Sequence, residues 1–210
     1  MLSEFKRLIK PTYLHFKDEI AKRKAKHKVR YLLRTQKEIL LELGAGSTVR
    51  DGWITIDTVE SCDIIWDLRN GIPFPDKSVS LLYSSHFFEH LSFKEGQRFL
   101  DEFLRVMRPG GKFSICVPNA RIYIKAYLRN ADLDTNTFSI YKPAYNETTR
   151  IDYVNYTAYM DDNHKYMFDE ENLIYILKSK GMRNVRLREF NPSLDLKVRD
   201  FESIYAEAEK

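Results

Sequence analysis

The 210-residue sequence lacks any apolar run near the about 20 residues that a membrane-spanning helix needs. Its first residues, MLSEFKRLIKP, contain an acidic residue and no uninterrupted apolar segment, so we expect no signal peptide. The only two cysteines, Cys62 and Cys116, lie far apart in strand-like runs, which is typical of buried, reduced thiols. Hydrophobic residues make up 43% of the chain, which excludes a disordered protein. Together these features predict a globular, cytoplasmic protein.

Acidic residues are scarce at the start of the chain. Residues 1–37 hold twelve Lys or Arg and three Asp or Glu, a net charge of +9 against +4 for the whole chain. Apolar residues follow helical steps of three and four from Leu2 to Ile20. We therefore interpret residues 1–37 as a basic helical extension in front of a domain at 38–210. Its lysines either lie in water or form a surface for anionic lipid, a phosphorylated substrate or nucleic acid.

From residue 38 onward, short apolar runs alternate with helical segments. The strand-like runs are EILLEL, WITID, DIIWD, SVSLLYSS, KFSICVPN, NVRLREF and SIYAEAE. A capping box at Ser92 to Glu95 begins one helix, and Asp169 begins another that stops before Gly181. This alternation predicts an α/β fold with a mostly parallel sheet and helices on both faces. Ligands of such sheets bind beyond the carboxyl ends of the strands.

The connections after the first two strands are unusually short. They comprise residues 44–52 and 58–62, whereas parallel neighbours normally need roughly a dozen residues, mostly helical. We therefore expect the first two crossover helices to be abbreviated to one turn or absent. Part of one sheet face is then uncovered, and we expect the basic N-terminal helix to pack there.

The stretch LELGAG, residues 41–46, places two glycines after the first strand but lacks a third. In dinucleotide-binding loops the third glycine packs the helix whose N-terminus binds pyrophosphate, so its absence disfavours a dinucleotide. Gly44 and Gly46 let the backbone approach a ligand closely. Asp57, at the end of the second strand, is suited to accept two vicinal hydroxyls. It follows Gly46 sooner than the usual interval of about 20 residues.

Five motifs in order resemble the class I S-adenosylmethionine-dependent methyltransferases, and residues 38–119 carry the resemblance. The motifs are LELGAG, Asp57, WDL at 66–68, GIPFPDKSVSLLYSSHFFEHL at 71–91 and FLRVMRPGGKFSICVPN at 103–119. The last two are similar to the small-molecule branch, and in particular to predicted methyltransferases associated with bacterial surface-polysaccharide synthesis. The resemblance implies a Rossmann-like seven-stranded sheet, S-adenosylmethionine as cofactor and methyl transfer as activity.

The resemblance also implies roles for individual residues. Asp57 would bind the ribose hydroxyls, and Asp67 and the Leu68 backbone N–H would bind adenine. Glu42 would attract the positive amino end of the methionine moiety. The residues expected to bind the cofactor are Glu42, Gly44, Ala45, Gly46, Asp57, Asp67, Leu68 and Ser84.

The segment SSHFFEHL, residues 84–91, contains an H-x-x-E-H pattern like that of inverted zinc peptidases. A third ligand at a recognisable interval is missing, so we expect no metal and a metal-independent transfer. The resemblance places this segment beside the transferred methyl, which makes His86 a candidate general base, His90 a pocket or base residue and Glu89 an orienting group. His164, in DDNHKYMFD, is a further base candidate. A packing role for each histidine is the alternative.

Residues 120–166 form a long connection that contains eight of the thirteen tyrosines. Tyrosine suits sugars and aromatic rings, so we interpret this segment as a substrate-covering insertion, with a structural excursion or dimer contact as the alternative. Its Lys and Arg residues favour an anionic or phosphate-bearing acceptor.

Three functions compete. The first is a methyltransferase for a small-molecule or saccharide-type acceptor. The second is an RNA or protein methyltransferase that uses the basic N-terminus, although the chain lacks an NPPY-like motif. The third is a non-catalytic binding protein on the same fold. Nucleic acid is the less favoured partner, and the basic N-terminus is also suited to contact a membrane surface.

Overall fold

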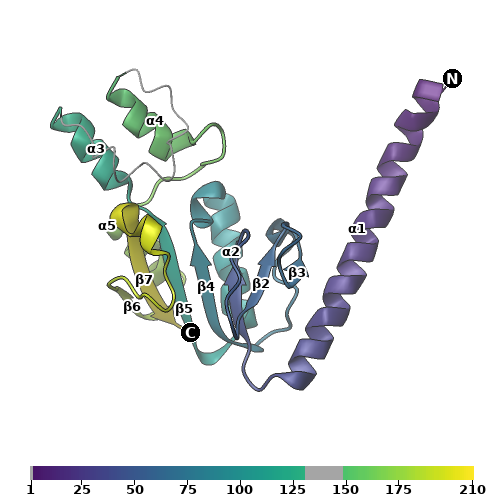
Figure 1. Cartoon of the computed structure of the whole chain (residues 1–210). Helices are drawn as coiled ribbons and strands as arrows, with labels where there is room; N and C mark the ends of the chain where they lie inside the picture. Colours follow the sequence, from purple (N-terminus) through teal and green to yellow (C-terminus); the bar gives the residue numbers. More distant parts are fainter. Residues whose placement is uncertain (1, 131–148) are drawn as a thin grey trace.

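A twisted seven-stranded sheet forms the centre of the computed structural model, which describes residues 2–130 and 149–210 and, up to residue 18, the backbone only (Figure 1). The strands are β1 (Leu40–Leu43), β2 (Ile54–Asp57), β3 (Ile64–Ile65), β4 (Val79–Ser85), β5 (Met107–Pro118), β6 (Arg183–Leu187) and β7 (Ser203–Glu209). Their order is β3-β2-β1-β4-β5-β7-β6, and β7 alone runs antiparallel to its neighbours. The predicted Rossmann-like, mostly parallel sheet is confirmed.

The helices begin and end where local signals place them. They are α1 (Leu2–Thr35), α2 (Phe93–Val106), α3 (Ala120–Leu128), α4 (Ile151–Tyr159) and α5 (Glu170–Ser179), with short 3-10 helices η1 (Leu68–Asn70), η2 (Phe88–His90) and η3 (Lys197–Glu202). Both halves of the predicted capping box form at Ser92 and Glu95. The side chain of Asp169 caps α5, and Gly181 follows with a φ of 76° that favours glycine.

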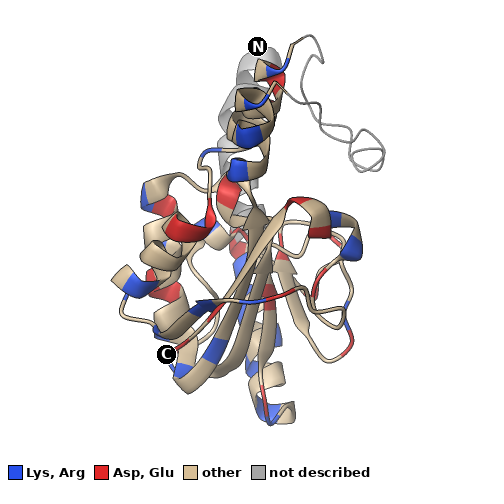
Figure 2. Cartoon of the chain, turned by 90° about the vertical axis from the view of Figure 1, so that its left-hand side faces the viewer, with Lys and Arg blue, Asp and Glu red and all other residues tan. Residues whose placement is uncertain are grey.

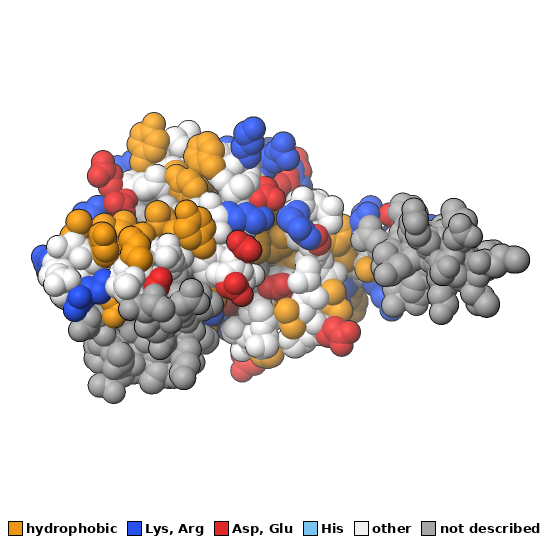
Figure 3. Space-filling model, turned by 90° about the horizontal axis from the view of Figure 1, so that it is seen from above, with side chains coloured by type: hydrophobic (Ala, Val, Ile, Leu, Met, Phe, Trp, Pro, Cys, Tyr) orange, Lys and Arg blue, Asp and Glu red, His pale blue; other side chains and the backbone are white. Residues whose placement is uncertain are grey.

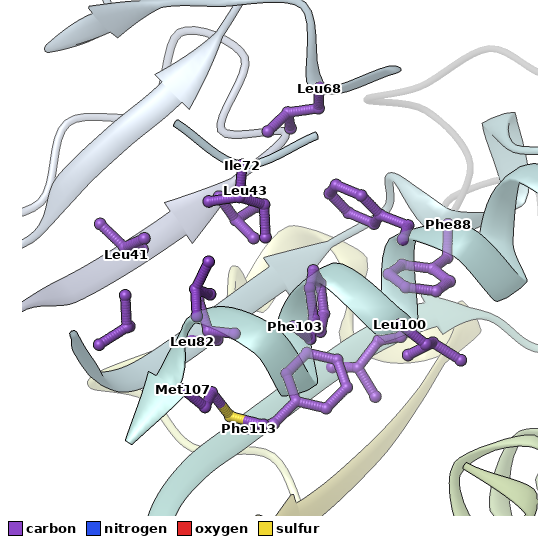
Figure 4. Packing of buried hydrophobic residues seen from close by; sticks show 14 of the residues in the cluster. Leu41, Leu43, Leu68, Ile72, Leu82, Phe88, Leu100, Phe103, Met107 and Phe113 are labelled. Atoms are coloured by element: carbon purple, nitrogen blue, oxygen red, sulfur yellow. The ribbon is translucent and has the colours of Figure 1, made fainter. Parts of the chain in front are cut away.

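The main hydrophobic core lies between the sheet and α2. Phe99, Leu100 and Phe103 of α2 are buried at helical spacing, and the Phe103 ring lies 4.6 Å from the Phe113 ring of β5. Phe113 is in register with Leu82 of β4, so both side chains lie on the face that α2 covers (Figure 4). Each such side chain contributes about 1.5–3 kcal/mol by leaving water.

The two short connections contain no helix, as predicted for residues 44–52 and 58–62. On β1 and β4, the sheet face opposite α2 carries the buried side chains of Glu42 and Tyr83. Arg50 lies over this face: its Nε donates to Glu42 Oε2 at 3.0 Å, and its other nitrogens donate to the carbonyls of Ser193 and Leu194 at 3.0 and 2.6 Å. Loop residues thus cover this face in place of the crossover helices that normally join parallel strands.

Helix α1 lies beside β3 at the edge of the sheet (Figure 1). Ala25, Val29 and Leu32 are buried in the core, whereas Ile20 is 39% exposed, so the helix packs through its last three turns. The expectation that α1 covers the exposed sheet face is correct only in part, because loop residues cover the Glu42 face. The apolar side chains from position 2 to position 16 lie outside the described residues.

Two further predictions concern the cysteines and membrane-spanning segments. Both cysteines are free and buried, as predicted. Within the described part of the chain, no helix is long and apolar enough to cross a membrane.

Candidate functional site

A cleft of about 490 Å³ opens beyond the carboxyl ends of β2 and β3. Its lining residues are Asp57, Thr58, Trp66, Asp67, Leu68, Arg69, Phe87, His90, Leu91, Glu95, Asp162, Asn163 and Lys165. Seen from above, acidic and basic side chains gather in the middle of the molecule, next to a region of hydrophobic side chains (Figure 3). Because the cleft lies beyond the carboxyl ends of the strands, it is at the position where open parallel sheets bind ligands.

Asp57 joins the glycine loop to the end of β2. Its Oδ2 accepts a hydrogen bond from the Gly46 backbone at 2.9 Å, and its Oδ1 accepts one from the Thr58 backbone at 2.5 Å. These bonds fix the carboxylate in place at the rim of the cleft. The predicted ribose acceptor is thus oriented before any ligand binds.

The two glycines of the loop have different roles. Both have a positive φ, 71° at Gly44 and 56° at Gly46, which favours glycine. A Cβ at Gly44 would lie only 2.4 Å from the Phe87 ring, whereas a Cβ at Gly46 would meet nothing within 4 Å. The absence of a Cβ at Gly44 therefore makes room for the Phe87 side chain, whereas the space beside Gly46 is open. Ala45 is buried between them.

Asp67 and Leu68 lie in the cleft, as the sequence predicts for an adenine site. Asp67 caps η1 and forms an ion pair with Arg69 at 2.7 Å. The hydrogen bonds from Arg69 hold the pKa of Asp67 below its usual range. Trp66 is fixed beside them because its Nε1 donates to the Gly71 carbonyl at 2.7 Å.

Five of the eight predicted cofactor residues are absent from the cleft lining: the glycine loop 44–46, and also Glu42 and Ser84. Glu42 is buried and forms an ion pair with Arg50 on the sheet face opposite α2. Ser84 is buried, and its hydroxyl donates to the Leu43 carbonyl at 3.0 Å, which links β4 to β1. Their predicted contacts with the cofactor are untested, and in this structure both serve the sheet.

His86, the first candidate base, lies in the turn directly after β4 and is absent from the cleft lining. His86 has a φ of 48°, and its side chain is 5% exposed. Its Nε2 lies 2.8 Å from the Ser203 hydroxyl, and its Nδ1 lies 3.6 Å from Glu89 Oε1. Burial holds the pKa of His86 well below its usual value, so it stays neutral. Its role as base remains a prediction, and its surroundings are those of a packed side chain.

His90 lines the cleft, and His164 lies directly behind it, with 5.1 Å between the ring centroids. The His90 Nδ1 is 2.9 Å from the Asn163 carbonyl, and the His164 Nδ1 is 3.0 Å from the Thr157 carbonyl. Glu89 is buried beneath them, and this burial raises its pKa to about 8. The cleft therefore ends in a compact group of two imidazoles and one carboxyl.

The tyrosine-rich connection lines the cleft with polar residues and not with the predicted tyrosines. Tyr123 and Tyr156 are buried against each other, with 5.6 Å between their rings, and Tyr159 is 62% exposed. The described tyrosines of this connection are absent from the cleft lining, which instead includes Asp162, Asn163 and Lys165. Tyr141 and Tyr145 lie outside the described residues.

The cleft lining includes residues that the sequence patterns do not predict, among them Phe87, Asn163 and Lys165. Phe87 follows His86, and Asn163 and Lys165 flank His164. Adjacency to a candidate base is the one sequence signal that these three residues share.

Comparisons with known proteins agree with this architecture. Residues 57–115 match the family model of a methyltransferase domain. No curated protein matches the chain by sequence. Among solved structures, an S-adenosylmethionine-dependent methyltransferase of Archaeoglobus fulgidus is similar over 94% of this chain and 99% of that one, with 16% identity and a TM-score of 0.51.

Two more solved structures are similar at 16% identity and a TM-score of 0.51. One is an S-adenosylmethionine-dependent methyltransferase of Methanosarcina mazei, which covers 83% of this chain and 93% of that one. The other is the 1,6-didemethyltoxoflavin-N1-methyltransferase of Burkholderia thailandensis with 1,6-didemethyltoxoflavin and S-adenosylhomocysteine bound, covering 99% and 86%. These likenesses show the fold. The family match over residues 57–115 agrees with the predicted methyltransferase class.

Proposed function

We propose that the protein transfers the methyl group of S-adenosylmethionine to a small-molecule or saccharide-type acceptor. One observation supports this most strongly. A single cleft has the carboxylates suited to the cofactor, Asp57 and Asp67, at one end and a separate polar group, His90, Asn163 and Lys165, at the other.

The size of the cleft favours a small acceptor. Its volume of about 490 Å³ is within the range of roughly 300–1,000 Å³ that small-molecule sites have. With the cofactor bound, the space that remains fits a compact molecule or the end of a saccharide. The polar side chains of His90 and Asn163 suit a hydroxylated acceptor. Lys165 is paired with Glu95 at 3.7 Å, and acidic residues outnumber basic ones in the lining, so the charges of the cleft favour a neutral acceptor over an anionic one.

The chemistry asks little of the protein. The sulfonium of the cofactor already activates the methyl, so the protein must hold an acceptor oxygen or nitrogen in line with it at about 3–3.5 Å. If Asp57 holds the ribose and the 66–68 segment holds adenine, the methionine end points along the glycine loop. We infer that the transferred methyl then lies on the side of Phe87 and His90.

A nucleic-acid acceptor has less support from the distribution of charge. In the view of Figure 2, acidic and basic positions alternate along the ribbon of the described residues. Nucleic-acid surfaces normally carry a field of one sign. The basic helix α1 lies at the β3 edge of the sheet. Methylation of RNA is therefore the alternative result that the test below can detect.

The test follows the fate of a labelled methyl group. The purified protein is incubated with methyl-labelled S-adenosylmethionine and, separately, with small molecules, oligosaccharides, RNA and protein from a cell extract. We expect label in the small-molecule or oligosaccharide fraction, and less label with an Asp57→Ala control at a cofactor concentration that does not saturate the variant. Label that appears only in RNA or protein would overturn the proposal.

A further inference from the structure

Three side chains at the His90 end of the cleft have the composition of a metal site. One donor atom each from Glu89, His90 and His164 lies within 4.8 Å of the other two. His90 Nε2 is 3.9 Å from Glu89 Oε1. Two imidazoles and one carboxylate form the donor set of catalytic zinc sites and of non-haem iron sites. An ion with bonds of about 2.1 Å holds such donors roughly 3.4 Å apart in a tetrahedron, so the three draw together on binding.

The hydrogen bonds of both imidazoles prepare them for this role. A backbone carbonyl accepts only, so the Nδ1 atoms of His90 and His164 must carry the protons that Asn163 and Thr157 accept. Their Nε2 atoms then present lone pairs. A ligating histidine is typically held by such a second hydrogen bond to a carbonyl, which fixes both its tautomer and its orientation.

Glu89 supplies an independent observation. Its side chain is 3% exposed, and its Oε2 has no hydrogen-bond partner among the described residues. A buried polar atom without a partner costs about 1–3 kcal/mol. Its Oε1 faces His86 at 3.6 Å and His90 at 3.9 Å. A cation bound by this carboxylate would give the Glu89 side chain a partner that the described residues do not supply to Oε2.

The fold assembles the three residues from distant parts of the chain. Glu89 and His90 lie in η2, directly after β4. The backbone N–H groups of Lys165 and Tyr166 both donate to the Glu89 carbonyl, at 2.7 and 3.2 Å. These two bonds hold His164 beside η2. The spacing of the sequence could not reveal this third ligand, which is why the sequence predicts a site without metal.

We propose that Glu89, His90 and His164 bind one divalent transition-metal ion, such as Zn²⁺. Imidazole nitrogen is a poor ligand for Mg²⁺ and Ca²⁺, which prefer oxygen. His90 is 36% exposed and lines the cleft, so the remaining coordination positions face the cleft. If the proposed function is correct, an oxygen of the acceptor can occupy one of them, and the metal would lower the pKa of a bound hydroxyl. Metal binding itself does not depend on that function.

The experiment measures metal binding without any acceptor. Tag-free full-length protein, freed of metal with a chelator, is titrated with Zn²⁺ by calorimetry and heated with and without Zn²⁺. We expect one Zn²⁺ per chain and a rise in melting temperature, which Mg²⁺ does not produce. Co²⁺ in place of Zn²⁺ should give visible ligand-field bands.

Variants identify the ligands. His90→Ala and Glu89→Gln should each weaken Zn²⁺ binding by at least about tenfold, the lower end of the effect of mere outer-shell partners. The matched control is His27→Ala, because His27 is exposed on α1. His90→Ala is the safer ligand variant, since its side chain is partly exposed. The proposal is overturned if the wild type binds no Zn²⁺, or if His90→Ala binds it as tightly as the control. Failure of methyl transfer with Zn²⁺ binding intact would count against the proposed function alone.

Discussion

Replacing Asp57 with alanine should weaken S-adenosylmethionine binding by about 5- to 150-fold. The reasoning starts from the contacts of the carboxylate, which accepts hydrogen bonds from Gly46 and Thr58 while it lines the cleft. These bonds orient the carboxylate toward the cleft rim, so we expect the substitution to change affinity through the contacts with ribose. A hydrogen bond to a charged group contributes about 1.5–3 kcal/mol and a neutral one about 1 kcal/mol. A loss of about 1–3 kcal/mol gives that range, since about 1.4 kcal/mol is tenfold.

Calorimetric titration with S-adenosylmethionine measures the effect, and two further variants sharpen it. Asp57→Asn keeps an oxygen acceptor for Gly46 but loses the charge, so its affinity should lie between those of the wild type and Asp57→Ala. Asp51→Ala is the control, because Asp51 is exposed in the turn before β2. Circular dichroism checks that each variant is folded. A folded Asp57→Ala protein with an affinity within about twofold of the wild type would refute the reasoning and remove Asp57 from the cofactor site.

The remaining predictions concern stability and turnover. Gly44→Ala should lower the free energy of unfolding, measured with urea, by about 2–4 kcal/mol, because strain at positive φ of about 1–2 kcal/mol adds to overpacking against Phe87. Gly46→Ala should show the strain alone, because a Cβ there meets nothing within 4 Å. Equal losses of stability in the two variants would contradict this prediction. Hydrogen bonds from Arg105 hold the pKa of Glu102 below 4.5, so Glu102 stabilises the fold above that pH and the contribution disappears as the pH falls through the folded pKa. Glu102→Gln should therefore flatten the acid limb of stability against pH, and an unchanged limb would contradict the assignment. His86→Ala should lower the melting temperature and leave S-adenosylmethionine affinity nearly unchanged, because the ring packs on Ser203 outside the cleft; a loss of turnover of about 10²–10⁴-fold in a stable variant would restore it as the base.

Local patterns in the sequence were sufficient for the elements and for part of the site. The predicted strand-like runs correspond to all seven strands. The central strands β1, β4 and β5 are mostly buried and need a nearly continuous apolar sequence, whereas β6 is an exposed edge strand with a more polar one. The capping residues Ser92 and Asp169 mark where two helices begin. Asp57 and Asp67 lie in one cleft because the carboxyl ends of neighbouring parallel strands meet at one edge. Periodicity and parallel topology therefore determine these features without any knowledge of packing.

The direction of individual side chains was beyond the reach of such patterns. Glu42 and Ser84 have the right positions in their motifs, yet both side chains are held within the sheet by partners, Arg50 and the Leu43 carbonyl. Arg50 lies over Glu42 because residues 44–52 are too few for a helix. A pattern of strands cannot say which distant loop will occupy the face that a missing helix leaves open.

The group of Glu89, His90 and His164 shows most clearly the difference between what sequence patterns predict and what packing decides. The sequence itself identified Glu89, His90 and His164 as chemically capable residues, and their spacing argued against a common site. Two backbone hydrogen bonds from Lys165 and Tyr166 to Glu89 bring His164 beside His90, across 74 positions of sequence. Such contacts depend on how a long connection packs back on the sheet, and they leave no periodic trace. The sequence by itself thus determined the fold and the position of the cleft at the carboxyl ends of the strands, whereas only the tertiary structure decided which side chains meet there.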